Sequence, residues 1–154
     1  MDKSKAPNPQ YFEGMLQLRG NSDEVISFIR HQALKHPTAY ISKEKSLPEG
    51  VDFYFSDNKF LRALGKKLKE SFTGEMKISA TLHTKSRQSS KELYRVTVLF
   101  RQLHFKKGDT FLFQGEKVEV LRIANDVLVK NKKTGEKKHM SLQEAEKASM
   151  RNIL

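Results

Sequence analysis

The first regular pattern in the chain, residues 10–20, alternates apolar and mostly polar side chains. Phe12, Gly14, Leu16 and Leu18 fall on one side of this alternation. A period of two is typical of a strand that buries one face. We therefore expect residues 10–20 to form the first strand of a domain, with these four residues on its inner side.

Two later segments repeat apolar residues every three or four positions, the spacing of a helix that buries one face. The first helix is expected to begin after Asn21 or Ser22 and to end before Pro37. The second is expected to begin after Ser56 or Asp57. The apolar positions are Val25, Ile26, Ile29, Ala33 and Leu34 in the first helix and Phe60, Leu61, Leu64, Leu68 and Phe72 in the second.

Strands are predicted around these helices. A short extended piece at 38–42 and a turn-rich stretch at 45–50 precede an aromatic and β-branched run at 51–55. Two long alternating strands follow at 75–85 and 91–101. We expect the apolar face of these two strands to be core. The order of elements predicts an α+β fold, a two-layer sandwich with two helices on one face of a mostly antiparallel sheet.

The sequence pattern changes after the second long strand. Short strands alternate with turns every eight to twelve residues, which is typical of a small β-barrel of the SH3-like kind. Ser141 is expected to cap a short final helix, with Glu144 completing a capping box. The predicted organisation is a flexible tail at 1–9, a sandwich domain at 10–103 and a barrel domain at 104–154.

Composition adds a strong positive charge. The 154 residues include 29 Lys and Arg against 18 Asp and Glu, a net charge of +11. Such a surplus favours polyanionic partners, nucleic acid or an anionic membrane surface, although a lysine-rich surface also keeps proteins soluble. The chain has no cysteine, which excludes disulfides and thiolate zinc sites. It also has no signal peptide or long apolar run, so we expect a soluble cytoplasmic protein without membrane attachment.

Motifs for catalysis or cofactor binding are not found in the sequence. The histidines are scattered, and no pair has the i, i+4 spacing that places two metal ligands on one helical face. No phosphate-binding glycine loop, nucleophile motif or paired acidic couple is recognisable. We therefore predict no enzyme, no metal, no cofactor and no small-molecule substrate.

Clusters of basic residues are the remaining candidate sites. They occur at the tip and along one face of the long hairpin, at the junction of the two predicted domains, and in one hairpin of the barrel. Cations at such positions reach phosphates and give salt-sensitive affinity. A solvated hairpin that only improves solubility is the alternative. The candidate RNA-binding residues are Lys85, Arg87, Lys91, Arg95, Arg101, Lys106, Lys107, Lys130, Lys132, Lys133, Lys137 and Lys138.

Three stretches carry a resemblance to a known family. They are YFEGMLQLR at 11–19, GVDFYFS at 50–56 and YRVTVLFR at 94–101. In this order and spacing they resemble the large-ribosomal-subunit export adaptor family named for nonsense-mediated decay, the NMD-three family, and in particular its archaeal members. The resemblance covers most of the chain from Gln10 onward.

This resemblance implies a role in ribosome biogenesis. It implies a non-catalytic factor that binds late precursors of the large ribosomal subunit across the tRNA-binding region. It also implies a ribosomal-protein-like α/β domain followed by a domain similar to translation factor five A. Family members begin with cysteine-rich zinc modules, and this chain has no cysteine. It therefore resembles the central and C-terminal part of such a protein, and no export role is carried over.

Three functions remain open from the sequence. The first is an assembly factor that binds rRNA of the large subunit. The second is a protein-interaction adaptor that binds ribosomal proteins, with the charge serving only solubility. The third is a general RNA-binding module of translation. Salt dependence separates the first two, because phosphate contacts weaken steeply with salt and apolar contacts do not.

Overall fold

The computed structural model describes residues 10–20, 22–85 and 92–151, and the predicted tail at 1–9 lies outside these ranges. The chain forms two compact units, Met1–Gln102 and Leu103–Leu154. Within the described residues, no helix is long and apolar enough to cross a membrane.

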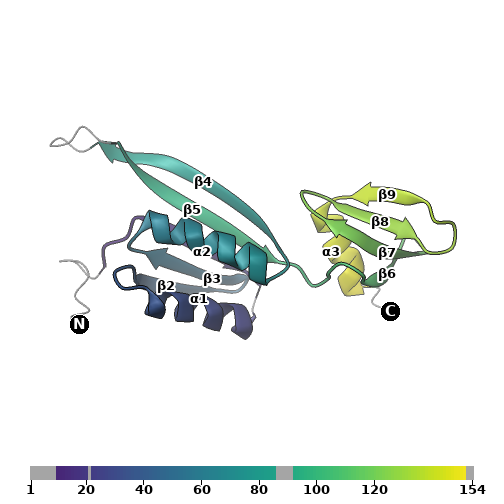
Figure 1. Ribbon diagram of the computed structural model, residues 1–154, viewed down its shortest axis with the longest axis horizontal. Helices are drawn as coiled ribbons and strands as arrows, with labels where there is room; N and C mark the ends of the chain where they lie inside the picture. The colour runs from purple at the N-terminus through teal and green to yellow at the C-terminus, as the bar shows by residue number, and fades with distance from the viewer. Residues whose placement is uncertain (1–9, 21, 86–91, 152–154) are drawn as a thin grey trace. The chain divides into compact units, whose positions relative to one another are not determined.

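The first unit contains a five-stranded sheet and two helices, and the predicted α+β class is confirmed (Figure 1). The strands lie in the order β2-β3-β1-β5-β4. Only the pairing of β1 with β5 is parallel among the strand pairs of this sheet that the structure describes. The elements are β1 (Gly14–Arg19), α1 (Asp23–Lys35), β2 (Ile41–Leu47), β3 (Gly50–Phe55), α2 (Asn58–Ser71), β4 (Gly74–Lys85) and β5 (Glu92–Gln102).

One face of this sheet carries the hydrophobic core. Leu16 and Leu18 of β1 and Phe53 and Phe55 of β3 are fully buried there. Residues of both helices belong to the same cluster, so both helices cover one face of the sheet, as predicted. Neither α1 nor α2 covers the other face, and we call it the open face.

Both helices begin at predicted capping residues. The Ser22 hydroxyl accepts a hydrogen bond from the Val25 amide at 3.3 Å, and an Asp57 carboxylate oxygen accepts one from the Phe60 amide at 3.1 Å. The predicted inner face of α1 is wrong at Leu34, which is 74% exposed. Successive helix residues are turned by about 100°, so the neighbour of the buried Ala33 already points away from the sheet.

Two predictions about strand limits need correction. Residues 45–47 belong to β2 and not to a turn, because they pair with β3 up to Leu47 opposite Gly50. At the first strand, β1 begins only at Gly14, and Phe12 does not lie on the inner side. Its ring instead contacts Tyr54 on the open face, with ring centroids 4.9 Å apart. The alternation of faces holds only within a strand. Because Phe12 lies before β1 begins, the alternation assigned its side chain to the wrong face.

The hairpin of β4 and β5 extends beyond the helices (Figure 1). At its base, Val98 and Phe100 are fully buried, as predicted. On the same face, Ile78 of β4 is 43% exposed although it pairs with the buried Val98, and Leu82 farther out is 53% exposed, so the prediction of a core face is wrong at these two positions. Strand β4 is an edge of the described sheet, so Ile78 and Leu82 have a neighbouring strand on one side only.

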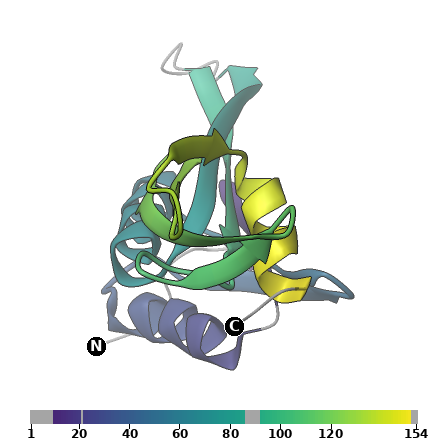
Figure 2. The ribbon, with the colours of Figure 1, turned by 90° about the vertical axis from the view of Figure 1, so that its right-hand side faces the viewer.

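The second unit is an antiparallel sheet with strand order β6-β7-β8-β9 and a helix beside it (Figure 2). The predicted barrel is not closed, because β6 and β9 remain the two edges of the described sheet. The capping box is confirmed: the Ser141 hydroxyl accepts from the Glu144 amide, and the Glu144 carboxylate accepts from the Ser141 amide. The elements are β6 (Thr110–Phe113), β7 (Glu116–Ile123), β8 (Val127–Asn131), β9 (Lys137–Met140) and α3 (Leu142–Arg151).

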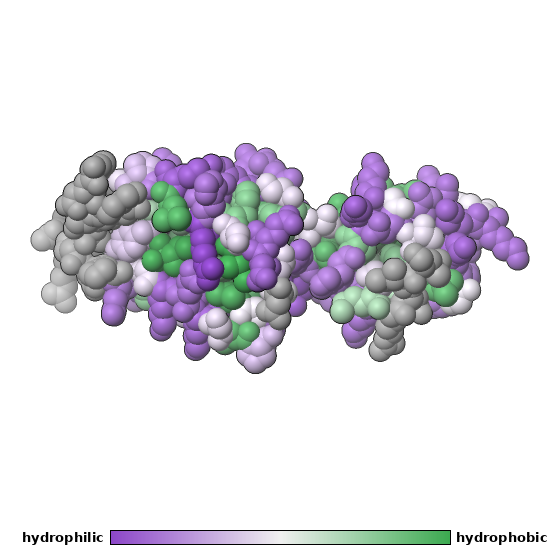
Figure 3. All heavy atoms as spheres, turned by 90° about the horizontal axis from the view of Figure 1, so that it is seen from below, coloured by the Kyte–Doolittle hydropathy of each residue, from purple (hydrophilic) through white to green (hydrophobic). Residues whose placement is uncertain are grey.

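A separate core holds the second unit together. Phe111, Val120, Val127 and Val129 of the sheet are fully or almost fully buried, and Ala145 of α3 packs with them. Hydrophilic residues make up most of the visible surface of each unit in Figure 3, with small hydrophobic areas between them. Lysines such as Lys66 in the first unit and Lys132 in the second are exposed, so charge lies on surfaces that solvent reaches.

Candidate nucleic-acid interface

The predicted cations of the long hairpin that the structure describes lie at three positions along its length. Lys85 is the last residue of β4 and is paired in register with Glu92. Arg87 and Lys91 fall outside the described residues. Arg95 and Arg101 lie on β5, and alternation places both on the open face, opposite to the buried Val96, Val98 and Phe100 of the same strand.

Arg95 is held in a fixed position. Its guanidinium lies over the ring of Phe12, 3.9 Å from the ring centroid. One of its nitrogens is 3.4 Å from Nε2 of His83 on the neighbouring strand. A guanidinium stacked on an aromatic ring gains a cation–π attraction and loses side-chain freedom. Arg95 is therefore a positioned planar cation and not a freely moving charge.

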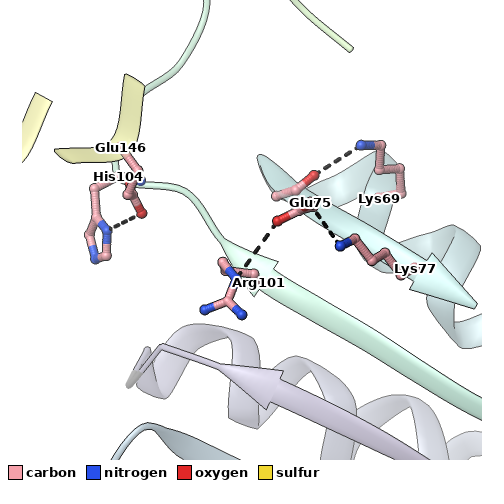
Figure 4. Close-up of polar contacts among 7 residues, drawn as sticks. Lys69, Glu75, Lys77, Arg101, His104 and Glu146 are labelled. Carbon is pink, nitrogen blue, oxygen red and sulfur yellow. Dashed lines mark hydrogen bonds and ion pairs between the residues drawn. The ribbon is translucent and has the colours of Figure 1, made fainter. Parts of the chain in front are cut away.

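Arg101 lies near the base of the same hairpin. Its Nε is 3.7 Å from a carboxylate oxygen of Glu75, and the Lys77 ammonium is 3.7 Å from the other oxygen (Figure 4). Ion pairs this long between exposed cations and a carboxylate contribute little to the stability of the protein. Both cations thus remain accessible, although Glu75 neutralises part of their charge.

A closer ion pair lies farther along the open face. Arg19 of β1 donates to Asp52 of β3 at 2.9 Å, and both side chains are largely buried. The register places this pair on the same side of the sheet as Arg101. Asp52 is therefore compensated by its neighbour and adds no net negative charge to the open face.

Lys106 and Lys107 are exposed in the turn that precedes β6 in the second unit. The Lys106 amide donates to a carboxylate oxygen of Asp109 at 3.0 Å, and the Asp109 amide donates to the carbonyl of Lys106 at 3.1 Å. These bonds fix the turn, so both ammonium groups are presented to solvent by an ordered backbone.

The turn between β8 and β9 is organised by Asn131, which is buried. Its side-chain oxygen accepts hydrogen bonds from the amides of Lys133 and Thr134, at 2.8 and 3.0 Å. Its side-chain nitrogen donates to Glu116 on β7. One buried amide thereby fixes the backbone that carries the lysine-rich turn.

The structure brings most of the predicted lysines of this hairpin together. Lys130 and Lys137 lie directly opposite each other on β8 and β9. Lys132 and Lys133 are exposed in the turn between them. Lys138 pairs with Val129 and so lies on the other face of the sheet. We call Lys130, Lys132, Lys133 and Lys137 the lysine turn.

Two exposed cations were not predicted from the sequence, one beside the lysine turn and one on the open face of the first unit. Lys117 is exposed on β7, and its carbonyl accepts a hydrogen bond from the Lys132 amide at 2.9 Å, which places it beside the lysine turn. Lys43 lies on β2 with its ammonium 5.5 Å from the ring centroid of Tyr54. Only strand pairing reveals these neighbours, because both cations are distant in sequence from the groups they join.

A hollow of about 700 Å³ lies beside Arg95. Its walls come from residues 10–13, from 93–96 of β5, and from Asn58, Arg62 and His83. The Tyr11 hydroxyl donates to a carboxylate oxygen of Glu13 at 2.7 Å. Burial, together with this hydrogen bond and the charge of Glu13, raises the pKa of Tyr11 to about 12.

Within the described ranges, no group of three or more His, Asp or Glu side chains could hold a metal ion. Two histidines instead form pairs with one carboxylate each. Nδ1 of His104 is 2.9 Å from Glu146 (Figure 4), and Nδ1 of His139 is 2.9 Å from Asp126. The first pair connects the segment before β6 to α3, and the second connects the turn before β8 to β9.

Comparison with known proteins assigns the family. Residues 11–101 match the family model described as NMD3, second domain. This match covers more than half of the 154 residues, and the chain belongs to the NMD3 family. The family consists of non-catalytic, ribosome-associated export adaptors that associate with the large ribosomal subunit. No curated protein sequence matches the chain.

Proposed function

We propose that this chain is a non-catalytic assembly factor that binds rRNA of the large ribosomal subunit, near its tRNA-binding region. Family membership supports the subunit as the partner. The net charge of +11 supports RNA as the part of the subunit that is contacted. The chain would act in the cytoplasm without a cofactor.

The lysine turn is the observation that carries this proposal. Lys130 and Lys137 are like charges directly opposite each other on neighbouring strands, an arrangement that costs stability and that Glu119, opposite Lys130 on β7, offsets only in part. The exposed Lys132, Lys133 and Lys117 add to the same positive field. A phosphate backbone relieves this repulsion, because it supplies negative charge and releases its own counterions.

The hairpin of β4 and β5 would supply a second contact. It extends past the helices, carries Lys77, Arg95 and Arg101 on its open face, and ends in the strand residue Lys85 (Figure 1). Lys106 and Lys107 of the second unit are further candidates for phosphate contacts. Shape and phosphate contacts of this kind are typical of binding to structured RNA.

Co-sedimentation with purified large ribosomal subunits over a salt series tests the proposal. The test variant changes Lys130, Lys132, Lys133 and Lys137 to Gln. Each lost phosphate contact lowers the slope of log affinity against log salt by roughly 1, so we expect weaker binding and a slope smaller by about 3 to 4. An excess of arbitrary RNA as competitor separates binding of this subunit from general RNA binding.

A matched control changes four exposed helical lysines to Gln, which removes the same total charge. If both variants bind equally well, the lysine turn is not the contact. Subunit binding by the parent chain that does not respond to salt would contradict RNA docking altogether. The control positions are Lys35, Lys59, Lys66 and Lys147.

A second candidate function is an adaptor that binds ribosomal proteins. The observation that favours it is a set of apolar side chains on the long hairpin, Ile78, Leu82, Leu93 and Tyr94, which are each more than 40% exposed. An apolar contact there would change little with salt. In the same sedimentation assay, Leu82→Ser would weaken such binding, whereas the lysine variant would not.

A further inference from the structure

A continuous row of cationic and aromatic side chains crosses the open face of the first unit. Lys43 of β2 lies over the ring of Tyr54 of β3 at 5.5 Å, and this ring meets Phe12 edge-on at 4.9 Å. Phe12 carries the guanidinium of Arg95 of β5 at 3.9 Å, and Arg95 reaches His83 of β4 at 3.4 Å. The row thus has members from each strand or from the segment leading into it, in the spatial order of the sheet.

The open face carries more positive than negative side chains. Register places Lys43, Lys45, Arg19, Arg101 and Lys77 on this face together with Arg95. The carboxylates that the same register puts there are Asp52 and Glu75, and both are already next to cations. A ligand for this face must therefore be anionic, and it must also present flat groups to the aromatic side chains.

An unpaired RNA strand has both properties. Its bases stack on aromatic rings and on arginine planes, and four-stranded sheets with exposed aromatics bind single strands in this way. A duplex hides the faces of its bases and offers only phosphates and groove edges. An acidic peptide would satisfy the cations but would leave the stacking surfaces without a partner. The combination of rings and cations in this row therefore favours RNA with accessible bases.

The hollow beside Arg95 adds room for such a base. It lies at the end of the row, where Phe12, Arg95 and His83 form part of its wall, and its volume of about 700 Å³ is within the range of small-molecule sites. The guanidinium of Arg62 and the Tyr11–Glu13 pair, in which the hydroxyl already donates to the carboxylate, supply polar groups in the same wall. A base that turns out of its strand would find both a stacking surface and hydrogen-bonding groups here.

We propose that the open face of the first unit binds an unpaired RNA segment, with bases stacked on Tyr54 and on the Phe12–Arg95 pair and one base in the hollow. Lys43 and Lys45 contact the phosphates of that segment. This inference rests on the proposed RNA-binding function and adds a site for bases to the phosphate contacts of the lysine turn. The ribosomal RNA segment it recognises would be a loop, a bulge or a strand end.

The test measures binding of a fluorescent ten-nucleotide oligouridylate, with an RNA duplex of equal length as comparison. The variant Phe12→Leu/Tyr54→Leu keeps apolar side chains but removes both rings. Stacking of one base on an aromatic side chain contributes at least about 1 kcal/mol of binding free energy. We therefore expect single-strand binding to weaken about fivefold or more. The salt slope should stay unchanged because no charge is altered.

The chain offers a close control for this variant. Phe28 and Phe72 form another edge-on ring pair, with centroids 5.3 Å apart, on the helix-covered side. Phe28→Leu/Phe72→Leu should leave oligouridylate binding unchanged, and circular dichroism checks that both variants fold. Arg95→Lys keeps the charge and removes the plane, so it should also weaken binding without changing the salt slope.

Ultraviolet cross-linking gives an independent readout, with uridine expected to attach at Phe12 or Tyr54. Equal binding by the parent and the Phe12→Leu/Tyr54→Leu variant would overturn the inference, as would equal affinity for duplex and single strand. Sedimentation with large subunits is measured in parallel. If the parent binds subunits in a salt-dependent way but not oligouridylate, this inference fails alone, and if it binds neither, the proposed function fails as well.

Discussion

The base and the outer half of the β4–β5 hairpin share one sequence pattern but have different surroundings. At the base, Val98 and Phe100 are fully buried. In the outer half, Leu82 pairs with Tyr94 on the same face, and both are about half exposed. The difference comes from α2, which approaches Val98 at the base through Gly65 and begins with Asn58, whose side chain donates to the carbonyl of Tyr94 at 2.8 Å, so the helix starts at the level of the outer half and covers nothing beyond it. Alternation thus identifies a face, and a second layer decides whether that face is core.

Replacing the aromatic core residue at the base should have the largest effect on stability. Phe100→Ala removes a fully buried ring and leaves a cavity, so we expect a loss of about 4 kcal/mol in the free energy of unfolding. Leu82→Ala, in the outer half, should cost about 0.5 kcal/mol or less. Urea unfolding followed by circular dichroism measures both. Similar losses would mean that the outer half is packed after all.

A smaller effect is expected from Gly74→Ala at the start of β4. A methyl group there would overlap the ring of Phe100 and lie 2.9 Å from the carbonyl oxygen of Arg101. Because the ring is fixed in the core, we expect a loss of about 2 kcal/mol. Gly108→Ala serves as the comparison, since a methyl group at that position meets no other atom within 4 Å. Its cost of about 1 kcal/mol would come from backbone strain at φ +94°.

The smallest effect concerns the hollow beside the outer half. The raised pKa of Tyr11 predicts a phenolate that forms near pH 12, visible by ultraviolet titration and absent in Tyr11→Phe. Because this pKa lies above the usual 10, the contribution of Tyr11 to stability is complete below pH 10 and decreases as pH rises toward about 12. Glu13→Gln should lower the titration midpoint. A midpoint near 10 in the parent would show that the hydroxyl is freely solvated.

The sequence predicted the order of elements well because each has a strong local signal. The stripe of α2, the caps Ser22 and Asp57, and the capping box at Ser141 all depend on residues close together in the chain. Where cross-strand pairing determines the structure, local signals predicted the wrong secondary structure. The stretch 45–47 has turn-forming neighbours, yet it is a strand because β3 pairs with it.

The candidate site divides in the same way. The lysines near 130–138 were found because they are close in sequence, although the strand register puts Lys138 on the other face. The row on the open face could not be predicted, because it joins residues from Phe12 to Arg95 that meet only in the folded sheet. Arg95 was identified as a cation, but its stacking depends on Phe12 leaving the strand alternation before β1 begins.

The open second sheet gives the lysine-rich hairpin another consequence. Strand β9, Lys137–Met140, is an edge with unpaired backbone groups along one side, and such an edge can pair with an identical edge on another molecule. It is only four residues long and begins with two lysines, which makes two copies repel each other as they approach. The same positive charges that suit a polyanion thus also keep the molecules apart when that polyanion is absent.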